Sequence, residues 1–403
     1  MTHRPLILYE DAAARALEPF ALVRPFTEMR AGVPLVRERW ERLLQGPVDG
    51  RIGAPHLAAF DESGTPPHVV ELIAAQTIVA NARFLPSLDA TVGDADAWRA
   101  DGRIVAVRLR APLDPRALAD GSATLETLLP TDASIAPMHG WWVDHAWDPI
   151  RHLTAMLGPD INHLGPTLAV RDAHALGGVH VLGTHAVYIE DGATIEPLVV
   201  LDATQGPVLV RRGAHIQSFS RLVGPCAIGA DSVVHGDRVA ASSIGDQCRV
   251  RGEVSVSIFV GQANKAHLGF VGHSIVGRWA NLGAGTTTSN LKNSYGAVSL
   301  WTPAGARNTG MQFVGSLIGD HAKLAINTRL MTGSVIGAGA NVFDVLDGHT
   351  VVAPFAWGGV GDEVFALDKF IDVAERVLAR RGAPLSPGVR GALRAAHANR
   401  WTP

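Results

Sequence analysis

The residues best suited to chemistry lie in one stretch, residues 264–285, which reads NKAHLGFVGHSIVGRWANLGAG. It contains a histidine, His267, an asparagine, Asn281, and a Gly-Ala-Gly turn at 283–285. Histidine titrates near neutrality and is suited to act as a general base. The same stretch has glycines after aliphatic residues at short intervals, as a stacking repeat does. It is therefore either a structural coil that contains a histidine or an active site built on a coil.

The chain around this stretch repeats with a period of six residues. One aliphatic series runs from Val210 to Val234, a shifted one continues from Ile244, and another runs from Ile318 to Val342. Neither the helical period nor the strand period gives this spacing. A triangular solenoid does, because each six-residue unit makes one flat side whose aliphatic residue points inward. The alternative is an ordinary all-β domain with chance glycine spacing, and the period does not reveal the hand of the coil.

The six-residue register slips between Val256 and Val276, and the slip contains His267. A solenoid expels extra residues as a loop without disturbing its interior, and such loops are where sites form. The slip therefore favours a functional role for this histidine, although the chain has 17 of them. Their spacing shows no metal-binding motif.

The regions on either side of the repeat have other patterns. Strand-like segments at 5–9, 77–81 and 103–109 alternate with helical patterns at 34–45 and 67–76, so residues 1–160 are expected to form an α/β domain. A linker is expected at 156–167 and the solenoid at 166–358. Residues 361–403 are expected to form a helical segment, with one helix ended by Gly382, that caps the solenoid or packs on a neighbouring subunit.

Composition excludes several classes of protein. The formal net charge is −3, so no global field attracts nucleic acid or an acidic membrane. Two cysteines form no disulfide framework. No apolar run approaches the roughly 20 residues of a membrane span, and the N-terminal residues lack a signal-peptide pattern. We expect a cytoplasmic protein.

Residues 265–296, KAHLGFVGHSIVGRWANLGAGTTTSNLKNSYG, resemble the acetyltransferase site of the GlmU family, bifunctional enzymes that make UDP-N-acetylglucosamine. That family carries Lys-Ala-Gly-His-Leu, then Asn-Ile-Gly-Ala-Gly-Thr and a later Asn-Tyr. The resemblance implies that His267 is the general base, that Asn281 contacts the substrate amine and that Asn290 lies at the acetyl-CoA site. It also implies a left-handed parallel β-helix. Phrases at 23–41 and 352–359 extend the likeness to a divergent branch whose N-terminal nucleotidyltransferase-like domain is shortened.

The implied reaction transfers acetyl from the co-substrate acetyl-CoA to an amino-sugar phosphate. Backbone N–H groups of Gly283, Ala284 and Gly285 would bind the oxyanion or the pantetheine amides. A site on one flat side of a solenoid needs a neighbouring wall to enclose acetyl-CoA, so we expect a homotrimer.

The resemblance has two departures in this region. Phe270 stands where the family has a tyrosine, and the family's phosphate-binding lysine falls near Val256. Arg278 and Lys292 are the candidate replacements for the missing positive charge, with Arg249 and Arg251 as further ones. The substrate therefore need not be glucosamine-1-phosphate.

The N-terminal domain departs further from a nucleotidyltransferase. The glycine-rich loop after the first strand is absent, and Asn81 and Arg83 stand where the magnesium-binding aspartate is expected. Three residues are candidates for binding phosphate or nucleotide: Arg24, Glu28 and Arg30. Alternatively, the two arginines only flank a turn and pair with Glu28 or Glu38. Nucleotidyl transfer would need Mg²⁺, for which Glu10 and Asp11 are weak candidates.

The leading interpretation is thus a GlmU-like sugar nucleotidyltransferase and acetyltransferase that binds a sugar phosphate and a nucleotide. One alternative is an acetyltransferase whose N-terminal domain is degenerate. A second is a non-enzymatic trimeric scaffold. A third, a hexapeptide γ-carbonic anhydrase, needs three zinc-binding histidines that the sequence does not reveal.

Overall fold

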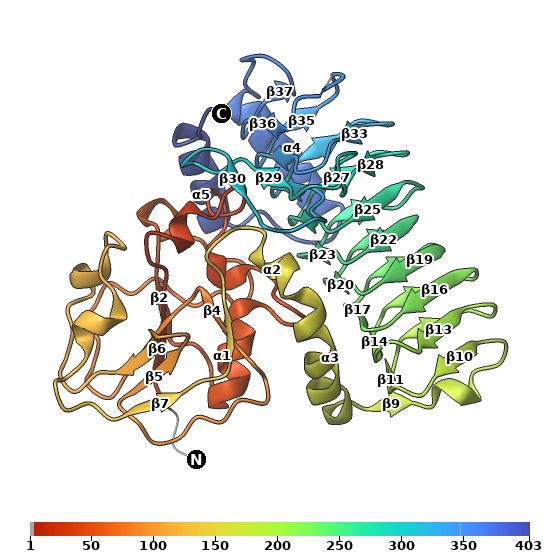
Figure 1. Cartoon of the computed structure of the whole chain (residues 1–403). Coiled ribbons are helices and arrows are strands. Elements are labelled where there is room, and N and C mark those ends of the chain that lie inside the picture. The colour runs from red at the N-terminus through yellow and green to blue at the C-terminus, as the bar shows by residue number, and fades with distance from the viewer. Residues whose placement is uncertain (1–3, 347) are drawn as a thin grey trace. The chain divides into compact units, whose positions relative to one another are not determined.

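The computed structural model describes residues 4–346 and 348–403 (Figure 1). It divides into two compact units. The N-terminal unit contains the chain up to Met29, Pro34–Ala146 and Gly382–Asn399, and the solenoid unit contains Arg30–Val33, Trp147–Arg381 and Arg400–Pro403. The expected C-terminal segment is shared between them, since its first helix belongs to the solenoid unit and its second to the N-terminal unit.

The N-terminal unit is built on a mixed sheet with the strand order β2-β1-β3-β6-β5-β7. The central strand β1 (Leu6–Tyr9) pairs in parallel with β2 (Gly50–Ile52) and β3 (Ile78–Asn81). β6 (Arg103–Arg108) is antiparallel to β3 and to β5 (Ala97–Ala100), and β7 (Ile135–Pro137) is parallel to β5. A separate antiparallel pair joins β4 (Phe84–Pro86) to β8 (Gly140–Trp142). The strands predicted at 5–9, 77–81 and 103–109 are confirmed.

Both faces of this sheet are covered. Leu6 and Leu8 of β1 belong to one buried cluster, and Ile7 and Tyr9 belong to another, as the alternation of side chains along a strand requires. The helix α1 (Val36–Leu44), predicted at 34–45, contributes Trp40 to the first cluster. Short 3-10 helices complete the connections in the chain: η1 (Ala14–Ala16), η2 (Phe26–Glu28), η3 (Pro55–Leu57), η4 (Pro115–Leu118), η5 (Leu125–Leu128), η6 (Gly165–Thr167) and η7 (Ala173–Ala175).

Two predicted elements differ from the structure. Residues 67–76 form no helix: Ile73 is buried and bridges to Leu113, whereas Val70 and Leu72 are exposed. The apolar residues of this segment do not share one buried face, and a short helix without such a face is not stable. The expected linker at 156–167 is instead mostly the helix α3 (Leu153–Leu164), which follows α2 (Asp148–Arg151). It buries Leu157 and Ile161, so packing of its apolar face overrides its glycine and proline.

The solenoid has three parallel sheets, which form its flat sides (Figure 1). The first contains β10 (His180–Gly183), β13 (Val200–Ala203), β16 (Ser220–Val223), β19 (Asp237–Ala240), β22 (Glu253–Ser255) and β25 (Phe270–Gly272). The second contains β11 (Val187–Glu190), β14 (Val208–Val210), β17 (Cys226–Ile228), β20 (Ser243–Ile244), β23 (Ile258–Phe259), β26 (Ile275–Val276), β31 (Leu317–Ile318), β34 (Val335–Ile336) and β36 (Val351–Val352), with β9 (Val170–Arg171) antiparallel at one edge. The third contains β12 (Thr194–Ile195), β15 (His215–Ile216), β18 (Val233–Val234), β21 (Arg249–Val250), β24 (Asn264–Lys265), β27 (Asn281–Leu282), β32 (Lys323–Leu324), β35 (Asn341–Val342) and β37 (Trp357–Gly358).

The six-residue series forms the interior of this solenoid, as predicted, except at the end of the shifted series, where Val256 is only half-buried and Val254 lies in the interior. Every member of the series from Val210 to Val234 and from Ile318 to Val342 is at most 3% exposed, and all belong to one apolar cluster. Consecutive coils stack in register, for example Ile228 on Ile244 and Ile244 on Phe259. The architecture is a parallel β-solenoid of hexapeptide repeats, consistent with a left-handed β-helix.

One coil is much longer than the others. Val276 pairs with Ile318 of the next coil. The chain runs through more than twice as many residues between these two positions as between Ile318 and its own partner Ile336. The extra residues leave the stack after β28 (Thr287–Thr288), which pairs with β33 (Arg329–Leu330). They include a small hairpin of β29 (Ser299–Leu300) and β30 (Arg307–Asn308). The stack of strands continues on both sides of this insertion.

The helix α4 (Leu367–Ala379) lies along the side of its own solenoid. Phe370 packs against Phe355 with ring centroids 4.9 Å apart, and Arg381, just after the helix, donates to the carbonyl of Gln247 at 2.8 Å. The helix thus contacts the last coil through Phe355 and an earlier coil through Gln247, and its packing on a neighbouring subunit stays a prediction. The second helix, α5 (Pro387–Ala398), lies in the N-terminal unit, where Asp61 accepts from the N–H of Val389.

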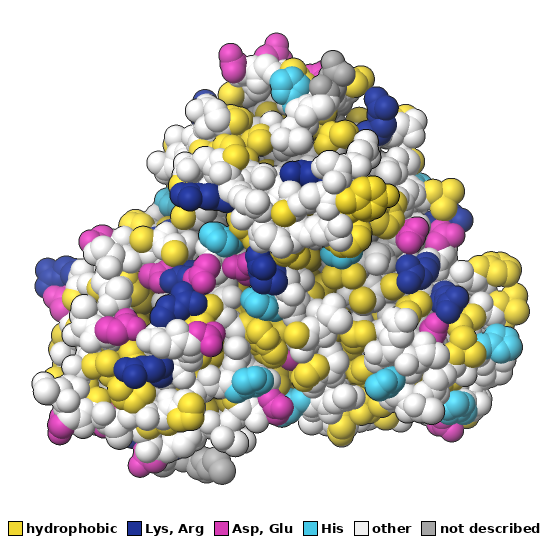
Figure 2. All heavy atoms as spheres, viewed as in Figure 1, with side chains coloured by type: hydrophobic (Ala, Val, Ile, Leu, Met, Phe, Trp, Pro, Cys, Tyr) yellow, Lys and Arg dark blue, Asp and Glu magenta, His cyan; other side chains and the backbone are white. Residues whose placement is uncertain are grey.

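On the face drawn in Figure 2, basic and acidic side chains are interspersed, and neither sign forms a single large field. This distribution agrees with the small net charge of the chain.

Candidate active site on the solenoid

The loop that carries His267 connects β24 to β25. His267 and Leu268 are exposed, and Leu268 is 57% exposed. The loop is held by its backbone, because both of these residues give their carbonyl oxygens to the ammonium group of Lys265. An exposed imidazole on an anchored loop is accessible to a substrate from solution.

Lys265 occupies an inward position of the solenoid. Its counterparts on the adjoining coils are Val250 and Leu282, and all three side chains are buried. Its Nζ atom donates to the carbonyl of Arg251 at 3.3 Å and of Leu268 at 3.1 Å, as well as to that of His267. Burial lowers the pKa of Lys265 to about 8, and the charge of Asp237 only partly opposes this. In the sequence this lysine lies where the six-residue register slips, so its inward position could not be recognised there.

Asn281 lies on the outer side of the third sheet, next to Asn264 of the preceding coil. The amide of Asn264 donates to the side-chain oxygen of Asn281 at 2.8 Å, which fixes the orientation of that amide while leaving its oxygen a second acceptor direction. Both asparagines line a cavity of about 620 Å³, and Ala266, the neighbour of His267, lines it too. The structure thus places Asn281 in a cavity next to the His267 loop, although His267 itself is not one of the lining residues.

In the Gly-Ala-Gly turn, the N–H groups of both glycines form hydrogen bonds within the solenoid. The N–H of Gly283 donates to Leu324 at 3.0 Å, and that of Gly285 donates to Leu268 at 3.2 Å. A Cβ atom at Gly283 would lie 2.5 Å from the backbone of Ala325, so the close approach of the coils requires glycine there. The N–H groups of these two glycines are thus engaged within the solenoid, and acetyl-CoA binding by this turn stays a prediction. The remaining candidate, Ala284, gives its carbonyl to Asn327.

Asn290 belongs to a second polar cluster at the start of the long insertion. Its amide lies 2.9 Å from Nδ1 of His273, whose ring stacks on Phe313 at a centroid distance of 5.3 Å. Burial lowers the pKa of His273, which favours a neutral imidazole. Sequence reasoning missed this histidine because nothing in the pattern distinguishes it from the others.

The other predicted substrate-binding residues do not line the cavity of Asn281. Lys292 donates to the carbonyl of Ala297 at 2.7 Å within the insertion. Arg278 is half-buried, and its backbone N–H donates to Asp320 at 2.9 Å. A different set of basic residues lines that cavity, and it includes Arg249, which the sequence had offered only as a further candidate.

The three phosphate-binding candidates of the N-terminal half are buried and engaged within the protein. Arg24 pairs with Glu62 at 2.6 Å, and Arg37 pairs with Glu28 at 3.1 Å. Arg30 belongs to the solenoid unit, where it donates to the carbonyl of Val260 at 3.2 Å. These contacts support the alternative that the arginines are structural, although their partners differ from the expected Glu28 and Glu38.

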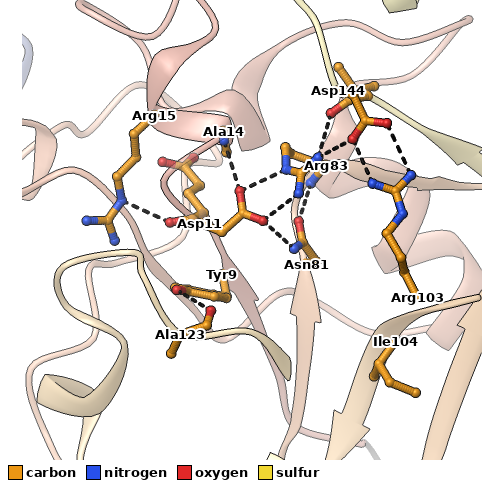
Figure 3. Close-up of polar contacts among 12 residues, drawn as sticks. Tyr9, Asp11, Ala14, Arg15, Asn81, Arg83, Arg103, Ile104, Ala123 and Asp144 are labelled. Atoms are coloured by element: carbon orange, nitrogen blue, oxygen red, sulfur yellow. Dashed lines mark hydrogen bonds and ion pairs between the residues drawn. The ribbon is translucent and has the colours of Figure 1, made fainter. Parts of the chain in front are cut away.

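A polar network occupies the carboxyl ends of the parallel strands β1 and β3 (Figure 3). Asp11 accepts two bonds from Arg83, at 2.8 and 2.7 Å, and one from Asn81 at 2.9 Å. Arg83 also pairs with Asp144 at 2.5 Å, and Arg103 pairs with the same carboxylate at 2.7 Å. Burial would raise the pKa of Asp11, but the bonds from Arg83 outweigh it, so that the pKa lies below its ordinary value.

Comparison with known proteins gives a family match for the N-terminal unit and several relatives. Residues 6–166 match the family model described as sugar nucleotidyl transferase. A bifunctional protein GlmU of Bartonella quintana is 31% identical over 182 residues, which cover 41% of this chain and 35% of the relative. The chain is GlmU-like.

Two further relatives show the same relationship. A bifunctional protein GlmU of a Jannaschia species is 34% identical over 163 residues, 40% of this chain and 31% of the relative. A bifunctional sugar-1-phosphate nucleotidylyltransferase/acetyltransferase of Sulfurisphaera tokodaii is 31% identical over 91 residues, 23% of either chain. The GlmU-like chain therefore matches about a third or less of the length of these relatives.

The site at β1 and β3 of this GlmU-like chain does not suit the Mg²⁺ that nucleotidyl transfer generally requires. Both carboxylate oxygens of Asp11 already accept from Arg83, so a cation would have to compete with that guanidinium group for the same oxygens. Glu10 is buried, and burial raises its pKa despite the nearby Arg51, so its charged form is disfavoured. In the described part of the chain, no group of three or more histidine, cysteine or acidic side chains is placed to hold a metal ion. Nor does any described helix have the length and apolar character to cross a membrane.

Proposed function

We propose that this GlmU-like chain transfers the acetyl group of acetyl-CoA to the amine of an amino-sugar phosphate, with His267 as the general base. The observation that carries the proposal is the His267 loop itself, anchored through Lys265 beside the cavity that contains Asn281. The amine nitrogen attacks the thioester carbon while His267 accepts a proton from that nitrogen. The carbon–sulfur bond then breaks, and CoA leaves as the thiol after taking up a proton.

Asn281 would orient the amine through its side-chain oxygen, which Asn264 already holds in place. Phe270 leaves the site without the hydroxyl that a tyrosine would provide, so the contacts to the sugar differ from those of the family. This difference supports an amino-sugar phosphate other than glucosamine-1-phosphate as a substrate to be tested.

The test is release of CoA from acetyl-CoA in the presence of a panel of amino-sugar phosphates. The variant His267→Ala should lose about 10²–10⁴-fold in rate, the usual effect of removing a general base. The matched control is His185→Ala, because His185 is also an exposed histidine of the solenoid. A His267→Ala variant with near-normal CoA release would exclude this residue from the mechanism.

Nucleotidyl transfer is the second candidate function, because residues 6–166 match a sugar nucleotidyl transferase model. The pairing of Asp11 with Arg83 opposes it. Incubation with nucleoside triphosphates and sugar-1-phosphates separates the two: release of pyrophosphate supports transfer, and its absence with every pair supports an N-terminal unit that keeps only the fold.

We further propose that the active form is a homotrimer with the acetyl-transfer sites between subunits. Leu268 beside His267, Tyr295 in the insertion and Ile326 two coils further on are 57%, 68% and 70% exposed. Apolar side chains exposed around a site are typical of a surface that a neighbouring molecule covers. Light scattering at assay concentrations should give three times the mass of the chain, and an active monomer would contradict this.

A further inference from the structure

The cavity beside Asn281 is strongly basic. Four of its lining residues are Arg249, Lys323, Arg380 and Arg381, and within the described chain no aspartate or glutamate lines it. Its volume is about 620 Å³. Arg249 and Lys323 come from the third sheet of the solenoid, whereas Arg380 and Arg381 follow the end of α4. The fold therefore brings basic residues together from segments far apart in the sequence.

The register of the third sheet explains how its residues reach the cavity. Arg249, Asn264, Asn281 and Lys323 pair in this order on successive coils, with a spacing of about 4.8 Å between neighbouring strands. The next residue on each strand is buried in the interior, so these four side chains point outward. These four side chains form a polar row with a basic residue at each end and the two asparagine amides between them.

The arginines beside α4 have a simpler explanation, since basic residues at the end of a helix interact favourably with its dipole. The hydrogen bonds of Arg249 and Arg381, however, are made with carbonyl groups of the solenoid. Arg381 donates to the carbonyl of Gln247 on the solenoid at 2.8 Å, and Arg249 donates to the carbonyls of Asp231 and Cys248 at 2.9 and 3.0 Å. No described carboxylate forms an ion pair with Arg249, Arg380 or Arg381. Neutral acceptors thus hold Arg249 and Arg381 in place without cancelling their charge.

The basic groups also act on one another. Burial lowers the pKa of Arg381, and the charges of Arg249 and Arg380 lower it further. Burial and the charge of Arg249 likewise lower the pKa of His235, which lines the same cavity. Lys323 gives two of its N–H bonds to the carbonyls of Trp279 and His321, so an ammonium group there retains a third donor. An anion would relieve the mutual repulsion of these groups.

We propose that this cavity binds the phosphate or pyrophosphate group of a ligand, with Arg249, Arg380 and Arg381 as its guanidinium donors and Lys323 as a further hydrogen-bond donor. Guanidinium groups suit this role because they bind phosphate oxygens in pairs of hydrogen bonds. The position next to Asn281 and the His267 loop suits either an amino-sugar phosphate or CoA. The choice of these two ligands rests on the proposed acetyl transfer, whereas anion binding itself does not.

Calorimetric titration of the full chain with inorganic pyrophosphate tests anion binding without any turnover. The double variant Arg380→Gln/Arg381→Gln should bind pyrophosphate at least about tenfold more weakly, which corresponds to about 1.4 kcal/mol. Arg376→Gln is the matched control, because this exposed arginine lies on α4 and donates to Asp372 of its own helix. If the double variant fails to fold, Arg249→Gln takes its place. Equal affinities in the variant and wild type, or no binding by wild type, would overturn the proposal.

Competition then identifies the source of the phosphate. Displacement of pyrophosphate by CoA, with weaker CoA binding in the double variant, assigns the cavity to CoA. Displacement by an amino-sugar 1-phosphate assigns it to the sugar substrate. If neither competes while the double variant still loses pyrophosphate, the anion site stands and the proposed acetyl transfer loses support. The variant His267→Ala should bind pyrophosphate as wild type does, so a failure of catalysis is distinguished from a failure of binding.

Discussion

Replacing Lys265 with methionine is expected to loosen the His267 loop without unfolding the solenoid. Methionine is apolar and suits an interior position between Val250 and Leu282, but it cannot donate to the carbonyls of Arg251, His267 and Leu268. A buried acceptor that loses its donor costs about 1–3 kcal/mol. Local opening of the loop should therefore become about 10- to 100-fold more frequent.

The stability of the whole unit should change less, because a second effect opposes the first. Burial lowers the pKa of Lys265 from 10.5 to about 8, so that holding the ammonium group in the interior costs about 3 kcal/mol. Methionine removes this cost. The variant should therefore reduce the local order of the loop while leaving the global stability nearly unchanged. A simple loss of core packing would instead reduce both.

Hydrogen exchange at the amide of Gly285 is the direct assay, because this N–H donates to Leu268 in the loop. Exchange there should rise about 10- to 100-fold relative to Gly319, whose N–H donates to Ile336 in a later coil. In wild type the same ratio should rise as the pH passes about 8 and Lys265 loses its proton, and in the variant it should not. Leu324→Met is the matched control, since it changes the same interior column without affecting the loop. Unchanged exchange at Gly285 in the Lys265→Met variant would refute the reasoning.

Two further predictions concern charged groups in the N-terminal unit and on the solenoid. Arg83→Met should destabilise the N-terminal unit in urea by about 1–3 kcal/mol, because Asp11 loses its charged partner whereas Asp144 keeps Arg103. The pKa of Asp11 is lowered in the folded chain, so this difference should be present above about pH 4 and shrink below it; a difference that persists in acid would contradict the assignment. Burial lowers the pKa of Lys323 to about 7, so the unfolded chain binds more protons between about pH 7 and 10, and the free energy of unfolding should rise with pH across that window. Denaturation of wild type and Lys323→Met at both ends of the window checks this, and an equal dependence on pH in the two proteins would exclude Lys323 as its source.

The interior of the solenoid could be predicted from sequence because its pattern is one-dimensional. An inward aliphatic residue at every sixth position, such as Ile228 or Ile336, needs no knowledge of distant parts of the chain. The central strands of the N-terminal unit were predictable for a similar reason, since β1 and β3 are short apolar runs. The segment 67–76 was not, because its neighbours in the fold, rather than its own period, decide which of its apolar residues are buried.

The candidate site was predictable only in part. His267 and Asn281 follow from a local motif, and the structure places the loop of one next to the cavity of the other. The pairing of Arg24 with Glu62 and the approach of Arg381 to Gln247 join residues far apart in the chain, which no spacing reveals. Lys265 was in view in the sequence, but the slip of the register concealed that it points inward.

The long coil between Val276 and Ile318 has a practical consequence for protein engineering. Strands on both sides of the insertion stack as they do elsewhere, so the length of this segment is not fixed by the repeat. Its hairpin ends in a turn where Thr302 and Gly305 bond to each other, and a Cβ atom at Gly305 would meet no neighbour within 4 Å. A fluorescent peptide tag or a short epitope placed at this turn should leave the coils intact. The insertion thus offers a labelling position on the rigid solenoid, from which distances within an assembly could be measured.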